Sequence, residues 1–188
     1  MNTTDNNTIT GTAPLQWFAM SATFRRELKA KSILSESGIE CFIPMKYTPV
    51  TKRDGRKVKE LIPAVHNLIF VHARKEDIQD IKQNIPYLQW LTRPVDGRNT
   101  PIIVPDNEME QFIKVTQDSN EHLIYLRPDE IDLKKGTRIR ILGGPFNGIE
   151  GTFLKIQGHR SRRVVVMIQG LIGVAMAEVT PDLIEVLE

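Results

Sequence analysis

The chain has 188 residues, of which 40% are hydrophobic and 26% are charged, and its formal net charge is +2. This composition is ordinary for a soluble globular protein, and a charge so close to zero gives no whole-chain argument for binding nucleic acid. The single cysteine, Cys41, excludes an internal disulfide and a cysteine-only zinc site, and no apolar run approaches the roughly 20 residues that span a bilayer.

The first residues form a polar segment, followed by a strand pattern and a helix pattern. Residues 1–14 lack the basic and apolar regions of a signal peptide, so we expect a disordered tail and a cytoplasmic protein. A compact apolar run over residues 15–20 predicts a buried strand. Apolar positions at three-to-five spacing, beginning with Phe24, predict a helix over residues 24–37 that Thr23 or Ser21 would cap.

A second strand over residues 39–44 leads into a basic segment. Six Lys or Arg residues lie between Lys46 and Lys59, against the acids Asp54 and Glu60. Asp54 is followed by Gly55, a dipeptide that favours the tight turn of a hairpin. The sequence therefore predicts an exposed basic hairpin.

The rest of the N-terminal half repeats strand and helix. Residues 67–71 form an apolar strand pattern, residues 75–83 a helix, residues 87–92 a strand, and residues 93–101 a turn-rich loop. A third helix should begin at Asp106, with an inner face made by Met109, Phe112, Ile113 and Thr116. This order predicts an α+β domain over residues 15–116, in which an antiparallel sheet carries its helices on one face.

The C-terminal part has a β pattern. Periodicity weakens over residues 117–131, which we interpret as a linker whose short apolar patch either anchors on a domain or adds a strand. Residues 132–188 read as four or five short antiparallel strands with glycine corners, among them the segment ILGGPFNGIEG. At this size we expect a small β-barrel.

Both halves of the chain carry a family resemblance. The run from GTRIRILGGPFNGIEGTFLKI through RRVVVMIQG resembles a KOW domain, and QWFAMSATFRRELKAKSIL, GIECFIPM and IPAVHNLIFV resemble the NGN domain of the NusG family. FIPM and HNLIFV are most similar to specialised paralogs of the RfaH/UpxY antiterminator type. The resemblance implies an NGN-like domain followed by an SH3-like KOW barrel.

The resemblance also implies a function. NusG-family proteins act in transcription elongation or antitermination, here at operons such as surface polysaccharide loci, and their NGN domain binds the clamp helices of RNA polymerase. The matching positions in this chain are Val65, Leu68 and Phe70, which as an interface would be exposed in the free monomer. The KOW domain would recruit the ribosome or Rho, and its candidate partner surface contains Phe146, Asn147, Arg160 and Arg162.

Each candidate has a structural alternative. For Leu68 and Phe70 the alternative is ordinary core burial, the usual role of apolar strands, whereas the family resemblance favours the interface. Eight exposed cations are candidates for contacts with the non-template DNA strand or nascent RNA, or are simply solvated: Arg25, Arg26, Lys52, Arg53, Arg56, Lys57, Arg93 and Arg98. His66, His72 and Cys41 lack the spacing of a metal site, and no cofactor is expected.

We expect no enzyme, because the glycine segment lacks the Lys-Ser/Thr of a phosphate-binding loop and no hydrolase motif is found. The alternative function is a ribosome- or RNA-binding accessory protein acting through the KOW barrel.

Overall fold

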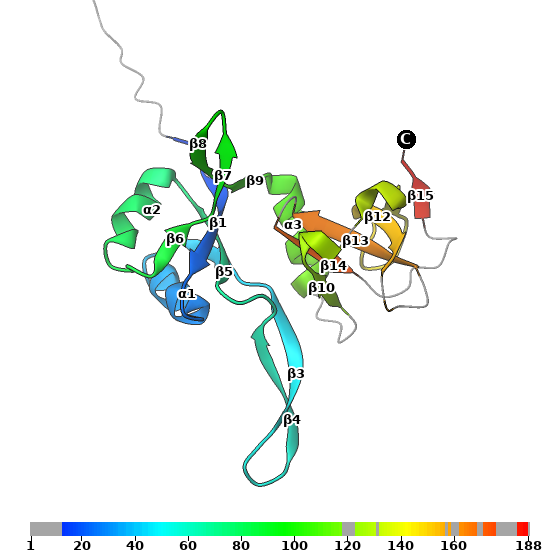
Figure 1. Ribbon diagram of the computed structural model, residues 1–188, viewed down its shortest axis with the longest axis horizontal. Coiled ribbons are helices and arrows are strands. Elements are labelled where there is room, and N and C mark those ends of the chain that lie inside the picture. Colours follow the sequence, from blue (N-terminus) through cyan, green and yellow to red (C-terminus); the bar gives the residue numbers. More distant parts are fainter. Residues whose placement is uncertain are drawn as a thin grey trace, which may run out of the picture.

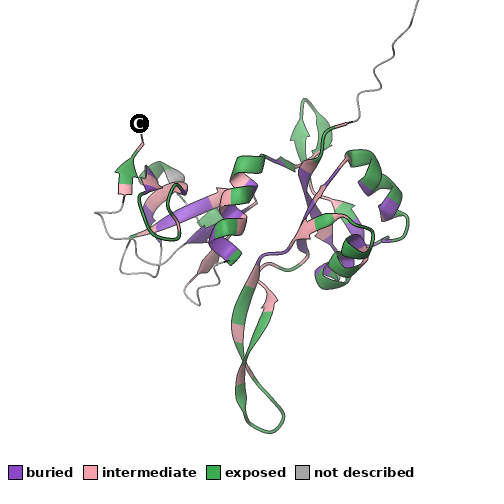
Figure 2. Ribbon diagram, turned by 180° about the vertical axis from the view of Figure 1, so that it is seen from behind, coloured by how far each residue is buried: buried purple, intermediate pink, exposed green. Residues whose placement is uncertain are grey.

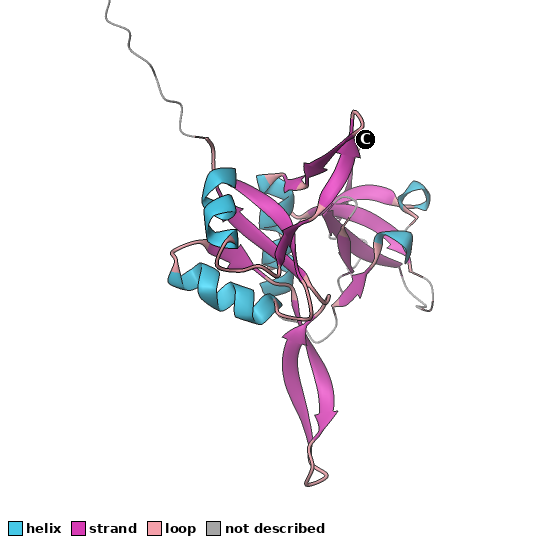
Figure 3. Cartoon of the chain, turned by 60° about the vertical axis from the view of Figure 1, so that its left-hand side comes forward, coloured by secondary structure: helices cyan, strands magenta, loops and turns pink. Residues whose placement is uncertain are grey.

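The computed structural model describes residues 13–117, 123–130, 132–156, 158, 162–168, 171–175 and 184–187. Two β modules lie side by side, and a long hairpin projects from the first of them (Figures 1 and 3). No helix in the described part of the chain is long and apolar enough to cross a bilayer.

The N-terminal module is built on a five-stranded antiparallel sheet. Its order is β2 (Glu40–Phe42), β5 (Leu68–Ala73), β1 (Gln16–Ala22) and β6 (Leu88–Trp90), and β9 (Ile103–Val104) also pairs with β1. β6 pairs with the end of β1 and β9 with its beginning, so the two short strands share one edge. The central strands β1 and β5 are buried along almost their whole length.

Helices cover both faces of this sheet. Phe18, Met20, Ile69 and Val71 pack in one cluster with α1 (Glu27–Glu36) and α2 (Lys75–Lys82). The alternate residues of the same strands pack against α3 (Asp106–Gln117). The prediction that the helices share one face is therefore wrong. β1 and β5 are apolar at successive positions because both of their faces are covered.

Two hairpins extend from the module. β3 (Met45–Thr51) and β4 (Lys57–Pro63) pair over seven positions, and Gly55 in the connecting turn has φ +81°, which confirms the predicted hairpin. β7 (Thr92–Val95) and β8 (Arg98–Pro101) form a second hairpin where we expected a loop. Its turn residues Asp96 and Gly97 both have positive φ, as the tight turn of a two-residue hairpin requires.

The C-terminal module is one antiparallel sheet of six strands. Its order is β10 (Ile124–Leu126), β14 (Ile172–Ala175), β13 (Arg162–Ile168), β12 (Glu150–Lys155), β11 (Thr137–Ile141) and β15 (Ile184–Val186). Two short 3-10 turns, Pro128–Glu130 and Leu133–Lys135, connect β10 to β11. Among the described residues β10 and β15 do not pair with each other, so the described strands form an open sheet and the expected closed barrel is not found.

The glycine-rich loop joins β11 to β12. Gly143, Gly144 and Gly148 all have positive φ, and the Gly148 N–H donates to the carbonyl of Ile141 at 2.8 Å. The Asn147 side chain also accepts from the N–H of Gly143 at 2.7 Å. Glycine is favoured at these positions because a side chain disfavours the left-handed backbone that the loop requires.

The two modules share one hydrophobic core through α3. Met109, Phe112 and Val115 of α3 belong to a cluster that contains residues of β1 and β5 as well as Ile139, Val164 and Val166 of the C-terminal sheet. The inner face expected for this helix included Ile113, which is only partly buried, and omitted Val115, which is fully buried. The buried positions of α3 differ from the expected ones because the helix packs against both the N-terminal sheet and the C-terminal sheet.

β10 lies inside the segment predicted as a linker and joins the C-terminal sheet as an edge strand beside β14. The phenol of Tyr125 in β10 donates a hydrogen bond to the carbonyl of Met45, at the base of the long hairpin, at 2.9 Å. The two alternatives left open for the apolar patch in this segment therefore occur together, since it forms an extra strand and also contacts the N-terminal module.

Candidate functional site

The sheet face that includes β5 brings the three predicted clamp-helix residues together. Leu68 and Phe70 belong to one cluster with Trp17 and Ala19 of β1, and Val65 packs against it from the loop before β5. Leu68 is 6% exposed and Phe70 is 0% exposed. The structure therefore assembles the apolar face and buries it, whereas an interface in the free protein was expected to be exposed.

The helix α3 covers this face. The ring of Phe112 lies 6.2 Å from the ring of Phe70 and 6.4 Å from that of Phe42, both in edge-on geometry. The C-terminal sheet packs on α3 in turn, mainly through β13. Any partner that contacts Leu68 and Phe70 must therefore displace α3, which the C-terminal module covers in turn.

We call the polar contacts between α3 and the C-terminal module the seam. The N–H of Glu150 donates to the side-chain oxygen of Gln111 at 2.7 Å. The ammonium of Lys114 donates to the carbonyl of Asn147 at 3.3 Å. Hydrogen bonds of this kind contribute modest net free energy but fix orientation. The seam therefore holds the module over α3 by contacts that water can replace.

The tip of the long hairpin is cationic and exposed, and Figure 2 shows the β3–β4 pair exposed over most of its length. Lys52, Arg53, Arg56 and Lys57 all lie at this tip as predicted. Arg56 binds Asp54 through two side-chain contacts of 2.6 and 2.7 Å, and these hydrogen bonds lower the pKa of Asp54. One carboxylate thus offsets part of the charge at the tip.

The turn between β1 and α1 carries two more of the predicted cations. Arg25 and Arg26 are both exposed, and the helix begins only at Glu27. Arg26 is the N-cap and makes no side-chain capping bond, so neither Thr23 nor Ser21 caps α1. The Thr23 hydroxyl instead donates to the carbonyl of Tyr87 at 3.3 Å.

Phe24, assigned to the inner helix face by its spacing, is 80% exposed. Its φ is +62°, and that of Arg25 is +55°. Both residues lie outside the helix, in a turn that periodicity does not reveal.

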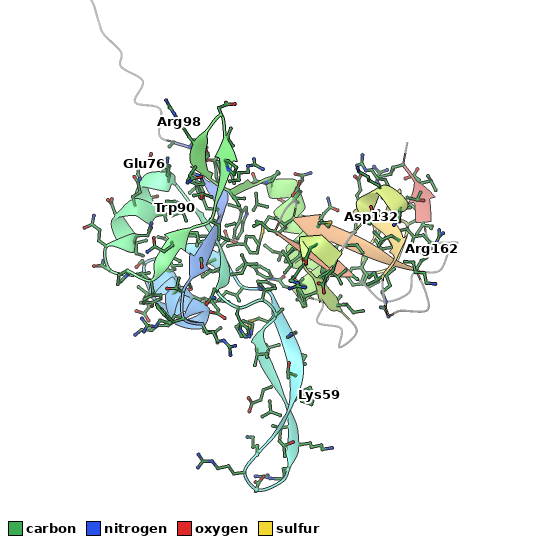
Figure 4. All side chains as sticks on the ribbon, viewed as in Figure 1. Lys59, Glu76, Trp90, Arg98, Asp132 and Arg162 are labelled. Carbon is green, nitrogen blue, oxygen red and sulfur yellow. The ribbon has the colours of Figure 1, made fainter. Side chains whose placement is uncertain are left out.

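The last pair of predicted nucleic-acid contacts, Arg93 and Arg98, lies on the exposed β7–β8 hairpin. Figure 4 labels Arg98 at one end of the N-terminal module, while Lys59 marks the long hairpin at the other end. The eight cations therefore do not form one patch. They occupy three separate places: the long hairpin, the start of α1 and the β7–β8 hairpin.

The predicted partner surface of the C-terminal module is divided in the structure. Phe146 is partly buried against the shared core, and Asn147 contributes to both the glycine loop and the seam. Arg162 is exposed and its guanidinium lies 5.9 Å from the centre of the Phe153 ring. Arg160 lies outside the described residues.

Two partly or fully buried ionisable side chains, Cys41 and Glu27, are the groups to consider for catalysis or metal binding. Cys41 is half-buried, and burial raises the pKa of its thiol. Glu27 is 1% exposed, and its carboxylate lies 3.8 Å from the Nδ1 of His66. No three His, Cys, Asp or Glu side chains gather into a metal site within the described residues.

Comparison with known proteins gives a family match. A profile described as "Transcription termination factor nusG" matches residues 15–113. A solved structure on the domain interaction in Thermotoga maritima NusG is 20% identical with a TM-score of 0.44, and the match covers 86% of this chain and 93% of that one. A structure of the MjSpt4:Spt5 complex is 13% identical with a TM-score of 0.27, and covers 91% and 96% respectively.

No curated protein matches the sequence. The family profile, in contrast, spans more than half of the chain, including β1, β5 and most of α3. The chain therefore belongs to the NusG family of transcription factors.

Proposed function

We propose that this protein is a transcription elongation and antitermination factor that binds RNA polymerase through the sheet face containing Val65, Leu68 and Phe70. The observation that supports the proposal most is the family match over residues 15–113, the region that holds this face. An amphipathic helix or helix pair binds to an apolar groove through its own apolar side chains, and the face supplies such a surface once it is uncovered.

Binding requires an opened state. Because Leu68 and Phe70 lie under α3, and the C-terminal module packs on α3, polymerase can compete for the face only when the module leaves α3 and α3 then withdraws from the sheet. The apparent affinity for the partner is then the intrinsic affinity multiplied by the fraction of molecules that are open. In this proposal the protein is a monomer of the RfaH/UpxY type, whose action at particular operons depends on a signal that opens the seam.

The C-terminal module acts in this proposal as a KOW-type domain that recruits the ribosome or Rho. Asn147 lies in the candidate partner surface and also accepts the seam hydrogen bond from Lys114. A partner that contacts this residue would therefore compete with closure. The cations of the long hairpin and of the α1 turn then face the non-template DNA strand or nascent RNA of the elongation complex.

The test is retention of purified bacterial RNA polymerase by the full-length protein, with ribosomal subunits in a parallel arm. Val65→Ser removes apolar area from the face at a half-buried position, and Val95→Ser makes the same change on the exposed β7–β8 hairpin as a control. We expect only Val65→Ser to weaken polymerase retention and the suppression of pausing. Retention of ribosomal subunits alone would instead support the accessory-protein alternative.

A further inference from the structure

The turn between β1 and α1 displays a large aromatic side chain in an unfavourable backbone conformation. Phe24 is the most exposed large hydrophobic side chain of the described residues, at 80%. Phe24 and Arg25 both have positive φ, at +62° and +55°. Bulky residues rarely adopt this region, and strained backbone concentrates at functional sites. A glycine would adopt either conformation without strain, so the backbone of this turn does not by itself call for a phenylalanine.

The surrounding structure holds this turn rigidly. The side-chain oxygen of Asn67, just before β5, accepts a hydrogen bond from the N–H of Arg25 at 2.8 Å. The carbonyl of the same asparagine accepts from the N–H of Ala22, also at 2.8 Å. On the other side, the N–H of Thr23 donates to the carbonyl of Tyr87 at 2.9 Å. The backbone on both sides of Phe24 is therefore held by two other segments of the fold.

A guanidinium lies beside the ring, and two further cations are close in the sequence. The guanidinium of Arg26 lies 5.5 Å from the centre of the Phe24 ring and 5.1 Å from that of Tyr87. Arg25 and Lys29 are exposed nearby in the sequence. The acid of this first helical turn, Glu27, is turned inward toward His66 and does not neutralise the surface.

The geometry points to Phe24 as a stacking site for an unpaired base of single-stranded nucleic acid, with Arg25 and Arg26 contacting the adjacent phosphates. Proteins bind single strands by combining a cationic surface with an exposed aromatic ring, because every base has a face that stacks. An apolar protein segment would make no favourable charge interaction with these flanking cations, whereas the phosphates of a nucleic acid would. The inference rests on the proposed function in one respect, since a transcribing polymerase supplies the single strand beside the bound factor.

The test measures binding of fluorescent 12-nucleotide single-stranded DNA and RNA to the full-length protein at low salt. Phe24→Gly relieves the backbone strain, so its melting midpoint should equal or exceed that of the wild type. Its affinity should nevertheless fall by about tenfold or more, the effect of losing one stacked base. Phe24→Tyr should keep the affinity, whereas Phe24→Leu, which keeps apolar area but not the ring, should lose it.

Leu28→Ala is the matched control, because Leu28 is an exposed apolar residue on α1 without backbone strain. It should leave the affinity unchanged, and a duplex of the same sequence should compete poorly. The stronger of the DNA and RNA arms identifies the strand. Affinity of Phe24→Gly within twofold of the wild type, equal competition by duplex, or full affinity in Phe24→Leu would each overturn the inference.

Polymerase retention by the same variants separates this inference from the proposed function. Retention should persist in Phe24→Gly if both are right. A wild-type protein that binds single strands in a Phe24-dependent way but does not retain polymerase would sink only the proposed function. A Phe24→Gly variant that loses polymerase and keeps its affinity for single strands would assign the ring to a protein contact and overturn the stacking role.

Discussion

Weakening the seam should make the protein a better polymerase ligand. Gln111→Ala removes the acceptor of the 2.7 Å hydrogen bond from the N–H of Glu150, while the apolar cluster between α3 and the C-terminal sheet stays intact. Alanine also favours the helix, so α3 itself should not be destabilised. The change therefore acts on how long the C-terminal module stays closed rather than on whether the protein folds.

The size of the effect follows from the geometry. This hydrogen bond is partly buried and links neutral groups, and water can reach the Glu150 N–H once the partner is gone. Its net contribution to closure is then about 1 kcal/mol. While the closed state dominates, this raises the open fraction about fivefold, and the apparent Kd for polymerase falls by the same factor.

The assay is a titration of fluorescent protein with RNA polymerase, with hydrogen exchange of β13 and α3 as an independent report on opening. Glu110→Ala, an exposed position on the same helix, controls for helix propensity and should change neither quantity. Faster exchange at the seam without tighter polymerase binding would show that the covered face is not the binding site. An unchanged exchange rate would refute the role given to Gln111.

Three further predictions follow from burial. Leu68→Glu should lower the free energy of unfolding by about 3–5 kcal/mol, because it places an unpaired charge in the core. Leu61→Glu, on the exposed hairpin, should melt at a nearly normal temperature. A normal melting midpoint for Leu68→Glu would show that the face is open. Burial raises the pKa of Tyr125 to about 12, so the stability that the neutral phenol provides should be complete below pH 10 and lost as the pH rises from 10 to 12. In calorimetry, the melting temperature of Tyr125→Phe should fall less over this pH range than that of the wild type. Identical pH profiles for the two proteins would contradict this prediction. Cys41 should react slowly with a disulfide reagent at pH 8, because its raised pKa leaves little thiolate, and it should react faster once the protein is unfolded. A rate in the folded protein equal to that of free cysteine would contradict the burial.

Local signals predicted the elements whose determinants are local. Asp54-Gly55 located the turn of the long hairpin, and the spacing of Ile78 and Ile81 located α2, because turn chemistry and helical periodicity depend on neighbouring residues alone. The β7–β8 hairpin contains the same Asp-Gly signal, but the segment also contains Pro94 and Pro101 and was expected to be a turn-rich loop. Proline is tolerated there because the ribbon has only two strands and leaves outward backbone positions unpaired.

The start of α1 could not be predicted from local sequence, whereas the coverage of the sheet on both faces could have been. Phe24 has helical spacing, but its conformation depends on Asn67, 43 residues later, and no local pattern reveals such a contact. The two covered sheet faces did have a signal, since Phe18 and Ala19 of β1, like Ile69 and Phe70 of β5, are apolar at successive positions. That signal should have placed helices on both sides.

The candidate site was predictable as a set of residues but not as a surface. Val65, Leu68 and Phe70 do share one face, yet their burial depends on where α3 and the C-terminal sheet pack. The dispersal of the eight cations over three places likewise depends on the directions of two hairpins. Both are consequences of tertiary structure, which strand and helix patterns leave undetermined.

The position of α3 between two β modules restricts how its sequence can change. The exposed side of α3 tolerates substitution, as in most surface helices, but Met109, Phe112 and Val115 on its other side are fully buried in a core that both modules share. A larger or smaller side chain at such a position must suit two packing partners at once, so a change that improves one module disturbs the other. Divergence of regulation in this protein should therefore proceed through the seam residues Gln111 and Lys114, which can vary while the buried side of the helix stays fixed.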